Sequence, residues 1–528
     1  MKIIIYQTLP RLFGNRHPNP VANGGIAENG CGKLSDYTPA VLDEIRQLGC
    51  NYIWYTGLLE HATQTDYSAF GIHGDHPAIV KGKAGSPYAI KDYYDICPDL
   101  ADDVPQRMKE FEDLVTRTHR AGLKVIIDFV PNHIARNYHS DVATVEDFGA
   151  SDNTHTTFAR DNNFYYLPGQ DLSFDGYHES PAKATGNDCF SASPSRNDWY
   201  ETVKLNYGVD YLNGRETHFS PIPQTWQKML DILLFWAKKN IDGFRCDMAE
   251  MTPVEFWAWA IPKVKAACPQ VIFIAEVYQP AEYRNYLHIG RFDYLYDKVG
   301  LYDTLRNVIV GRQPAADITH CWQAIGDIQP QMLNFLENHD EQRIASDFFA
   351  ADPRRALPAL VVAATMNVNP FMLYFGQELG ERGMDAEGFS GRDGRTTIFD
   401  YWSLPVLRQA PDSEQQALRR YYARLLQLCN QNKAIAEGKF FDLMYVNPQL
   451  AAGQYAFLRG KGKEVLLIVA NFDDRVVACD VQIPDAAWKY FGVKARKAAY
   501  SIEISGRGAF LAILNSDSSK LTNLLTIA

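Results

Sequence analysis

The sequence predicts an α/β protein: a closed (β/α)8 barrel with a small domain inserted after strand 3 and a C-terminal antiparallel β-sandwich. Three observations predict it. Short apolar segments alternate eight times with amphipathic ones. A polar region between Asn132 and Pro221 interrupts this alternation. The last hundred or so residues carry only short strand-like segments separated by turn residues.

The eight strand candidates are short and rich in β-branched and aromatic residues. They begin at Lys2, Asn51, Lys124, Gly243, Val271, Phe292, Met332 and Phe371. The segments between them carry helix signals: "TPAVLDEIRQLG", for example, has Pro39 near its start and Gly49 at its end. Apolar strands that alternate with helices are typical of a parallel sheet covered by helices, and eight such units indicate a barrel.

We therefore expect three domains. Residues 1–131 and 223–432 would form the barrel, 132–222 the inserted domain and 433–528 the β-sandwich. The inserted region is rich in Asn, Asp, Ser, Tyr and His, and a structureless loop of that length is improbable inside a compact domain.

Composition and net charge narrow the classes of binding partner and the cellular compartment. The net charge of −11 argues against nucleic acid and anionic membranes, and no apolar run approaches the roughly 20 residues of a membrane span. Nine scattered cysteines without a CxxC pair indicate reduced thiols. If Met1 is the natural start, we expect a cytoplasmic protein; if a signal peptide has been removed, a periplasmic or secreted one. Oligomeric state stays open.

Polar residues gather where the predicted strands end. Because parallel barrel strands all end at one face, these side chains should converge there. They are Asp128, Asn132 and His133 after the third strand, Arg245 and Asp247 on the fourth, Glu276 after the fifth, and Asn338, His339 and Asp340 after the seventh.

Arg245 and Asp247 lie two residues apart in "DGFRCDMAE" and should point to the same face of a strand. A neighbouring guanidinium lowers the pKa of a carboxyl, which suits a covalent nucleophile. Glu276 follows the apolar run "VIFIA", which favours the neutral acid needed to protonate a leaving group. Two carboxyls with opposed protonation are typical of glycoside cleavage.

Each feature alone has a structural explanation. Strand Arg–Asp pairs are more often ion pairs than catalytic groups, and His133 and His339 could serve as hydrogen-bonded scaffold. Their convergence on one face favours catalysis. No HExxH motif, paired Cys/His spacing, glycine-rich phosphate loop or GxSxG motif is present, so no catalytic transition metal or organic cofactor is expected.

The segments "DFVPNH", "GFRCDMAE", "AEV" and "ENHDEQR", in this order, resemble the four sequence regions of the α-amylase family (glycoside hydrolase family 13), and the domain layout is similar too. The resemblance implies that Asp247 is the nucleophile, Glu276 the general acid/base and Asp340 the transition-state stabiliser. The implied reaction is retaining cleavage of α-1,4-glucosidic bonds in α-glucans or malto-oligosaccharides through a covalent β-glycosyl–enzyme intermediate.

The resemblance also assigns the sugar-binding residues. Arg245, His133 and His339 would line the sugar site, and Tyr88 in "SPYAIKDYY" would stack on the sugar. Asp128 would support Arg245 from beneath.

The chain departs from the family beyond the nucleophile. Many members carry Lys-His three and four residues after it, where this chain has Glu250 and Met251. Glu250 could hydrogen-bond a glucose instead, which favours short oligosaccharides over starch. Asn132 matches a family calcium ligand, so a structural calcium ion is possible, with partners in the inserted domain.

Two alternatives remain. A 4-α-glucanotransferase uses the same intermediate, and differs in whether sugar or water reaches it. A non-catalytic carbohydrate-binding or partner-binding member of the fold would typically have lost an acidic residue, whereas Asp247, Glu276 and Asp340 are all present.

Overall fold

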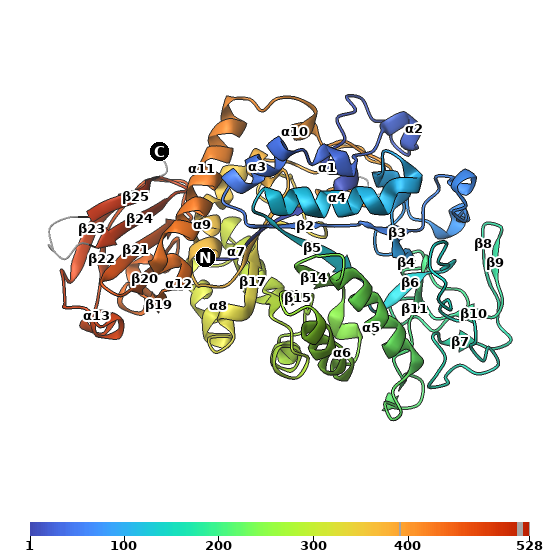
Figure 1. Cartoon of the computed structure of the whole chain (residues 1–528). Helices are drawn as coiled ribbons and strands as arrows, with labels where there is room; N and C mark the ends of the chain where they lie inside the picture. Colours follow the sequence, from blue (N-terminus) through green and yellow to red (C-terminus); the bar gives the residue numbers. More distant parts are fainter. Residues whose placement is uncertain (390–391, 515–520, 527–528) are drawn as a thin grey trace.

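The computed structural model describes residues 1–389, 392–514 and 521–526. Eight parallel strands close a barrel in the order β1-β18-β17-β16-β15-β14-β5-β2 (Figure 1). The strands are β1 (Ile4–Thr8), β2 (Tyr52–Tyr55), β5 (Lys124–Phe129), β14 (Gly243–Cys246), β15 (Ile272–Ala275), β16 (Tyr294–Tyr296), β17 (Met332–Phe335) and β18 (Phe371–Tyr374). Each falls within one of the eight predicted segments, so the barrel prediction is confirmed.

Helices follow the strands and cover the barrel. They are α3 (Pro39–Gln47), α4 (Arg107–Arg120), α5 (Gln224–Ala237), α6 (Val254–Ala267), α7 (Asp303–Ile309), α8 (Ile318–Ala324), α9 (Leu357–Thr365) and α11 (Ser413–Gln431), with short α1 (Pro10–Phe13), α2 (Ile26–Asn29) and α10 (Pro405–Arg408). At the start of α3, Thr38 caps the helix by accepting the N–H of Val41 at 3.3 Å.

Alternation along the strands separates two cores. Side chains such as Ile5, Ile126 and Met372 pack together in a cluster contributed by the barrel strands, whereas Ile4, Ile127 and Leu373 join the larger cluster that includes the helices. Successive strand residues point to opposite faces, so most barrel strands contribute to both cores; β14 contributes only Phe244 and Cys246 to the larger cluster. Among the described residues, no helix has the length and apolar content needed to cross a membrane.

A ladder that the sequence did not predict follows β2. Strand β3 (Leu59–His61) pairs antiparallel with β4 (Ile90–Ile96). The connection between them, residues 62–89, extends from the carboxyl end of the barrel and carries Lys81, Ser86 and Tyr88. Its anchor strand β3 has only three residues, too few for a sequence pattern.

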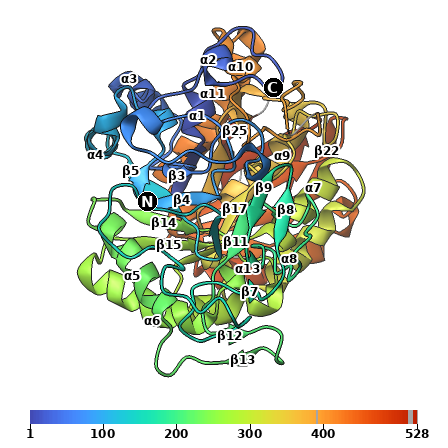
Figure 2. The ribbon, with the colours of Figure 1, turned by 90° about the vertical axis from the view of Figure 1, so that its right-hand side faces the viewer.

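The inserted segment forms small antiparallel ladders. They pair β6 (His133–Ala135) with β11 (Thr202–Lys204), β7 (Tyr166–Leu167) with β10 (Ala182–Lys183), β8 (Leu172–Phe174) with β9 (Tyr177–Glu179), and β12 (Val209–Asp210) with β13 (Glu216–Thr217). These strands lie at one end of the molecule in Figure 1 and face the viewer in Figure 2.

The C-terminal region is antiparallel, as predicted. Its main sheet has the order β19-β20-β21-β24-β25, and β22 pairs with β23 in a separate ladder. The strands are β19 (Lys439–Asp442), β20 (Gln454–Lys461), β21 (Glu464–Asn471), β22 (Val477–Gln482), β23 (Ala499–Ile504), β24 (Ala509–Leu514) and β25 (Leu521–Thr526). Helices α12 (Lys433–Glu437) and α13 (Asp485–Phe491) and strand β25 were not predicted. This sheet lies opposite the inserted segment in Figure 1.

Candidate active site

Arg245 lies at the centre of the carboxyl face of the barrel. Its Nη1 is 2.7 Å from Asp247 Oδ1, and its Nη2 is 2.9 Å from Glu276 Oε2. Asp247 directly follows β14, and Glu276 directly follows β15. The predicted contact between Arg245 and Asp247 is confirmed, and one guanidinium holds two carboxyls from neighbouring strands beside each other.

Strand register brings a third carboxyl to Arg245. In the β5–β14 pair, Asp128 stands opposite Arg245, and Asp128 Oδ1 lies 3.7 Å from Arg245 Nη1. The indole N–H of Trp54 and the backbone N–H of Gly57 donate to Asp128 Oδ2 at 3.2 and 3.1 Å. Gly57 has φ +75°, and an added Cβ there would lie 2.8 Å from Pro87. Asp128 thus lies beside Arg245, where the sequence prediction gives it a supporting role.

Glu276 has two further partners. Its Oε2 accepts the backbone N–H of Met248 at 2.8 Å, and its Oε1 accepts the hydroxyl of Tyr278 at 2.6 Å. Sequence reasoning missed Tyr278. Its position two residues after Glu276, on the same side of an extended segment, was a usable signal.

A hydrogen-bond chain fixes His339. The amide of Gln7 lies 2.8 Å from Nδ1 of His339 and donates to it, so we assign the ring proton to Nε2. Nε2 lies 2.7 Å from the hydroxyl of Tyr88, and that hydroxyl donates to Asp128 Oδ1 at 3.4 Å. Burial and the nearby Arg245 charge lower the pKa of His339 well below its usual value, which keeps the ring neutral.

Asp340 is the most open of the three acids. Its side chain is 40% exposed, and its Oδ2 lies 3.1 Å from His339 Nε2. Burial and the charge of Glu276 raise the pKa of Asp340 above its usual value.

The expected lowering of the pKa of Asp247 is wrong in its net direction. Burial raises the pKa of Asp247 well above its usual range; Arg245 opposes this rise, and the charges of Glu276 and Asp340 add to it. One guanidinium faces several carboxyls in a buried site, so these carboxyls together favour retention of a proton. Carboxyls that outnumber the guanidinium also suit a substrate that becomes cationic.

A cavity of about 340 Å³ lies over these acids. Asp247, Glu276 and Asp340 all line it, together with Lys81, Ser86, Tyr88, His133, Trp199, Glu201, Thr202, Met248, Tyr278, Ile398 and Phe399. The predicted residues Tyr88 and His133 therefore lie on its wall. Arg245 is 1% exposed and His339 3% exposed, so both lie beneath the floor and support the wall residues rather than form it.

His133 is positioned by the inserted segment. Its ring lies 5.2 Å from that of Trp199, and a Cβ added at Gly186 would lie 2.9 Å from His133 Cβ. Burial, with Lys204 and Lys81 nearby, lowers the pKa of His133 to about 3. His133 thus presents a neutral imidazole to the cavity at any ordinary pH.

An ion pair in the wall was also missed. Lys81 Nζ lies 2.6 Å from Glu201 Oε1, and both side chains are largely buried, at 14% and 4% exposure. Lys81 comes from the β3–β4 connection and Glu201 from the inserted segment, so the pair joins two parts of the wall. Trp199, Lys81 and Glu201 lie outside the strand-end motifs, and no sequence pattern pointed to them.

Glu250 lies outside the residues that line this cavity. Its Oε2 accepts the backbone N–H of Gln279 at 3.1 Å. The side chain is half-buried between the segments that follow β14 and β15. A contact from Glu250 to sugar is therefore not part of the described cavity wall and stays a prediction for a neighbouring sugar position.

Residues 22–398 match the family model "Alpha amylase, catalytic domain". The chain belongs to the alpha-amylase family. The match begins after β1, spans the other seven barrel strands and includes all three candidate catalytic acids, so the family and the predicted fold agree.

Curated relatives of this alpha-amylase family chain are distant. Alpha-amylase 3 of Dictyoglomus thermophilum is 23% identical over 382 residues, which cover 67% of this chain and 68% of that protein. A cyclomaltodextrinase of Geobacillus thermopakistaniensis is 22% identical over 443 residues, which cover 82% of this chain and 64% of that protein. The chain thus spans about two thirds of the length of these relatives.

Solved structures share the fold along nearly the whole chain. The noncanonic maltogenic alpha-amylase AmyB from Thermotoga neapolitana matches with a TM-score of 0.62 at 19% identity, covering 97% of this chain and 98% of that chain. The cyclic alpha-maltosyl-(1→6)-maltose hydrolase from Arthrobacter globiformis matches with a TM-score of 0.65 at 18% identity, with the same coverage. At these identities the likeness concerns the fold.

The calcium ion that the family implies does not fit the residues around Asn132. Asn132 Oδ1 accepts a hydrogen bond from Lys204 Nζ at 2.7 Å, and Lys204 Nζ lies 2.5 Å from Asp188 Oδ1. The Lys204 side chain is 1% exposed. An ammonium thus lies between the two oxygens, where a second cation would be repelled.

Proposed function

We propose that this chain is a retaining glycoside hydrolase that cleaves α-1,4-glucosidic bonds in malto-oligosaccharides. The observation that carries the proposal is the pairing of Asp247 and Glu276 on one guanidinium, below a cavity that Asp340 also lines. Two adjacent carboxyls from neighbouring strands suit a nucleophile and a general acid that act on one anomeric carbon.

In the first step, the proton that this group of carboxyls retains lies on Glu276, and ionised Asp247 attacks the anomeric carbon as the bond to the leaving sugar breaks. Arg245 binds Oδ1 of Asp247, which leaves Oδ2 for the attack. Glu276 gives its proton to the departing glycosidic oxygen, while Tyr278 and Met248 hold its carboxyl in place. The charge that develops on the ring is positive, and the excess of carboxyls around Arg245 stabilises it.

In the second step, Glu276, now ionised, takes a proton from water, and that water attacks the anomeric carbon. The bond to Asp247 breaks, the carboxylate returns to Arg245, and the product keeps the α-configuration. A sugar hydroxyl in place of water would give transfer, and the same residues serve both outcomes.

The cavity supports a short substrate. Its volume of about 340 Å³ lies at the lower end of the roughly 300–1,000 Å³ that ligand pockets span. Trp199 and the Lys81–Glu201 pair close one side of it. Tyr88, Tyr278 and Phe399 add the aromatic surface on which sugar rings stack.

A proton NMR time course with maltoheptaose tests the proposal. We expect shorter products whose new reducing ends are first α-anomeric. β-Anomeric products would overturn the retaining mechanism. Products longer than maltoheptaose would show that the enzyme transfers sugar rather than hydrolysing the bond. No change in the substrate would overturn the assigned activity on α-1,4 bonds.

Asp247→Asn should lower turnover by several orders of magnitude, because it removes the nucleophile. The fold should remain, since an amide of the same size can still accept from Arg245. Initial rates on maltoheptaose, with circular dichroism for the fold, measure this effect. The matched control is Asp161→Asn at an exposed position, which should leave the rate unchanged. A variant that keeps more than about a tenth of wild-type activity would exclude Asp247 as the nucleophile.

A further inference from the structure

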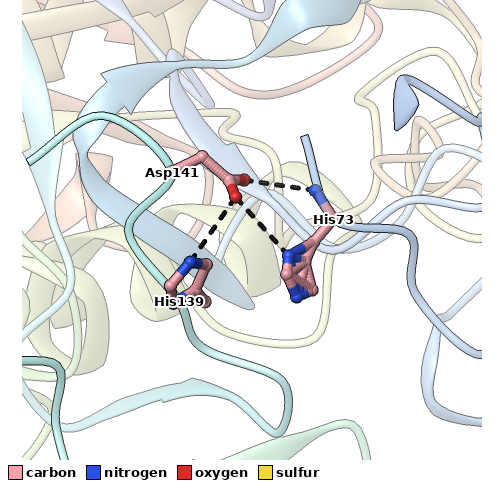
Figure 3. A group of neighbouring side chains, drawn as sticks. All are labelled: His73, His139 and Asp141. Carbon is pink, nitrogen blue, oxygen red and sulfur yellow. Dashed lines mark hydrogen bonds and ion pairs between the residues drawn. The ribbon is translucent and has the colours of Figure 1, made fainter. Parts of the chain in front are cut away.

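A second cluster of chemically reactive side chains lies outside the cavity wall. His73 belongs to the β3–β4 connection, and His139 and Asp141 follow β6 at the start of the inserted segment. In Figure 3 the carboxylate of Asp141 points between the two imidazole rings. Asp141 Oδ1 lies 3.5 Å from His73 Nδ1 and 3.7 Å from His139 Nε2.

These distances suit ligands of one shared metal ion. Bonds of about 2.0–2.1 Å in a tetrahedral site place neighbouring ligand atoms about 3.4 Å apart. One atom from each of the three side chains lies within 4.8 Å of the others. The two Asp141–histidine distances are also longer than the roughly 3.2 Å limit of a good N–H···O hydrogen bond.

The ring of His139 has a second carboxylate partner. Its Nδ1 lies 2.6 Å from Asp147 Oδ2, on the side of the ring away from Asp141. A carboxylate on the far nitrogen of a histidine is also the usual outer partner of a metal-ligating ring.

The ligands are held in place before any ion binds. The backbone N–H of His73 donates to Asp141 Oδ2 at 3.3 Å, and the backbone N–H of Asp141 donates to Asp92 Oδ2 at 3.0 Å. Lys91 on β4 joins both segments: its carbonyl accepts the N–H of His139 at 3.0 Å, and its ammonium donates to the carbonyl of His73. Such preorganisation lowers the cost of binding.

The approach to the cluster is open. The His73 and His139 side chains are 47% and 45% exposed, whereas the Asp141 side chain is 7% exposed. An ion can therefore arrive from solvent, keep a water as its fourth ligand and bind against a buried carboxylate. Two imidazoles and one carboxylate favour Zn²⁺ over Mg²⁺ or Ca²⁺, which prefer oxygen ligands.

We propose that His73, His139 and Asp141 form a binding site for a divalent transition metal ion, Zn²⁺ by preference. The ion joins the β3–β4 connection to the inserted segment. That connection also carries Lys81, Ser86 and Tyr88, which line the cavity. The site therefore stabilises the part of the cavity wall that this connection forms, and it takes no part in bond cleavage.

The test is titration of chelator-treated, full-length protein with ZnCl2 by isothermal calorimetry. We expect one equivalent to bind at this site and to raise the Tm. Asp141→Asn and the double variant His73→Ala/His139→Ala should each weaken binding more than a hundredfold, because removal of a direct ligand should cost more than the 10–100-fold typical of an outer partner. Asp147→Asn should weaken it about 10–100-fold, because it removes only the partner that positions His139.

His178→Ala is the matched control, an exposed histidine of the inserted segment that should leave zinc binding unchanged. Zinc held by the partly exposed Cys31, Cys189 or Cys479 would persist in all histidine variants. Absence of binding to the wild type, or equal affinity in the double variant, would overturn the proposal. Tighter binding of CaCl2 than of ZnCl2 would overturn the assignment of the metal class. Circular dichroism of each variant verifies the fold, and Asp147→Asn keeps the test decisive if a ligand variant unfolds.

Discussion

At the residue scale, Arg245 contacts the candidate catalytic carboxyls and also packs among buried aromatic rings that stabilise the barrel. Its guanidinium carbon lies 5.2 Å from the Trp54 ring and 5.4 Å from the Tyr296 ring, and its Nε donates to the Tyr296 hydroxyl at 3.1 Å. A lysine could not reach Asp247 and Glu276 simultaneously with a planar fork. Removal of one partner from such a buried ion pair typically costs about 3–5 kcal/mol, so this arginine has a structural role besides any role with sugar.

Tyr278→Phe should lower kcat on maltoheptaose about tenfold while KM changes little. The hydroxyl holds Glu276 Oε1 at 2.6 Å, and without it the carboxyl loses the alignment needed for proton transfer. The ring stays in the cavity wall, so sugar stacking persists. Steady-state kinetics measure kcat and KM separately. A rise in KM at constant kcat would instead make Tyr278 a binding residue only.

His133→Asn should weaken the acid dependence of stability. The unfolded state takes up a proton near pH 6.5, whereas the folded protein takes it up only near the lowered pKa of about 3. Between these values the unfolded state binds more protons, so His133 makes stability fall as the pH decreases below about 6.5. From pH 7 to pH 5 the wild type should lose about 2 kcal/mol more than the variant.

Urea unfolding at pH 7 and pH 5 measures this difference. His178→Asn is the control, since that side chain is exposed and should keep the wild-type dependence. Equal losses in wild type and His133→Asn would contradict a buried neutral imidazole.

At the scale of elements, strand pairing determines which groups meet. The β5–β14 register sets Asp128 against Arg245, and the β6–β11 register sets His133 against Lys204. A one-residue slip in either ladder would turn these side chains to opposite faces. The backbone hydrogen bonds of the β6–β11 ladder therefore position both His133, which lines the cavity, and the buried ammonium of Lys204.

Stability should not depend on calcium, because Lys204 already supplies a cation to Asn132 and Asp188. Addition of CaCl2 or EGTA should leave the wild-type Tm unchanged in differential scanning calorimetry. Lys204→Met should cost about 2–4 kcal/mol, since it leaves buried oxygens without their partner. Lys183→Met, which removes a more exposed ion pair in the same segment, should cost no more than about 1 kcal/mol. A Tm that rises by several degrees with calcium would contradict this role of Lys204.

At the scale of the whole molecule, local patterns predicted the barrel and its carboxyl face. All eight strands are apolar runs bounded by helix and turn signals, and their identity required no distant contact. The Arg245–Asp247 contact follows from the two-residue period of a strand, and three acids followed from strand ends. A feature can be predicted from sequence when it depends only on neighbouring residues of one strand or helix.

Several contacts between distant segments were not predicted. Gln7 and His339 meet across 332 residues, and Lys81 and Glu201 meet between two loops. The pKa of Asp247 depends on burial and on Glu276 and Asp340, which come from other strands. In the C-terminal region, the short α12, α13 and β25 lack the length at which periodicity distinguishes helix from strand.

The junction between the barrel and the C-terminal sheet depends on Arg459 of β20. Its guanidinium donates to the carbonyls of Thr365 on α9, Ile435 on α12, Gly438, and Lys439 at the start of β19. The side chain is fully buried, which lowers its pKa to about 9. A single side chain thus binds carbonyls from both parts of the molecule.

Arg459→Met should preserve the volume but leave these buried carbonyls without donors, at a cost of about 3 kcal/mol or more. We expect the calorimetric transition to split or broaden, with the C-terminal sheet unfolding first. Activity at 25 °C should persist, because none of the residues that line the cavity belongs to the C-terminal sheet. Amide hydrogen exchange in β20 and β21 should increase, whereas exchange in the barrel strands should stay close to that of the wild type.

The control is Arg475→Met, at an exposed position between β21 and β22, which should change neither the calorimetric transition nor the hydrogen exchange. An unchanged Tm in Arg459→Met would show that the apolar contact between α9 and the sheet is sufficient to hold the two parts together.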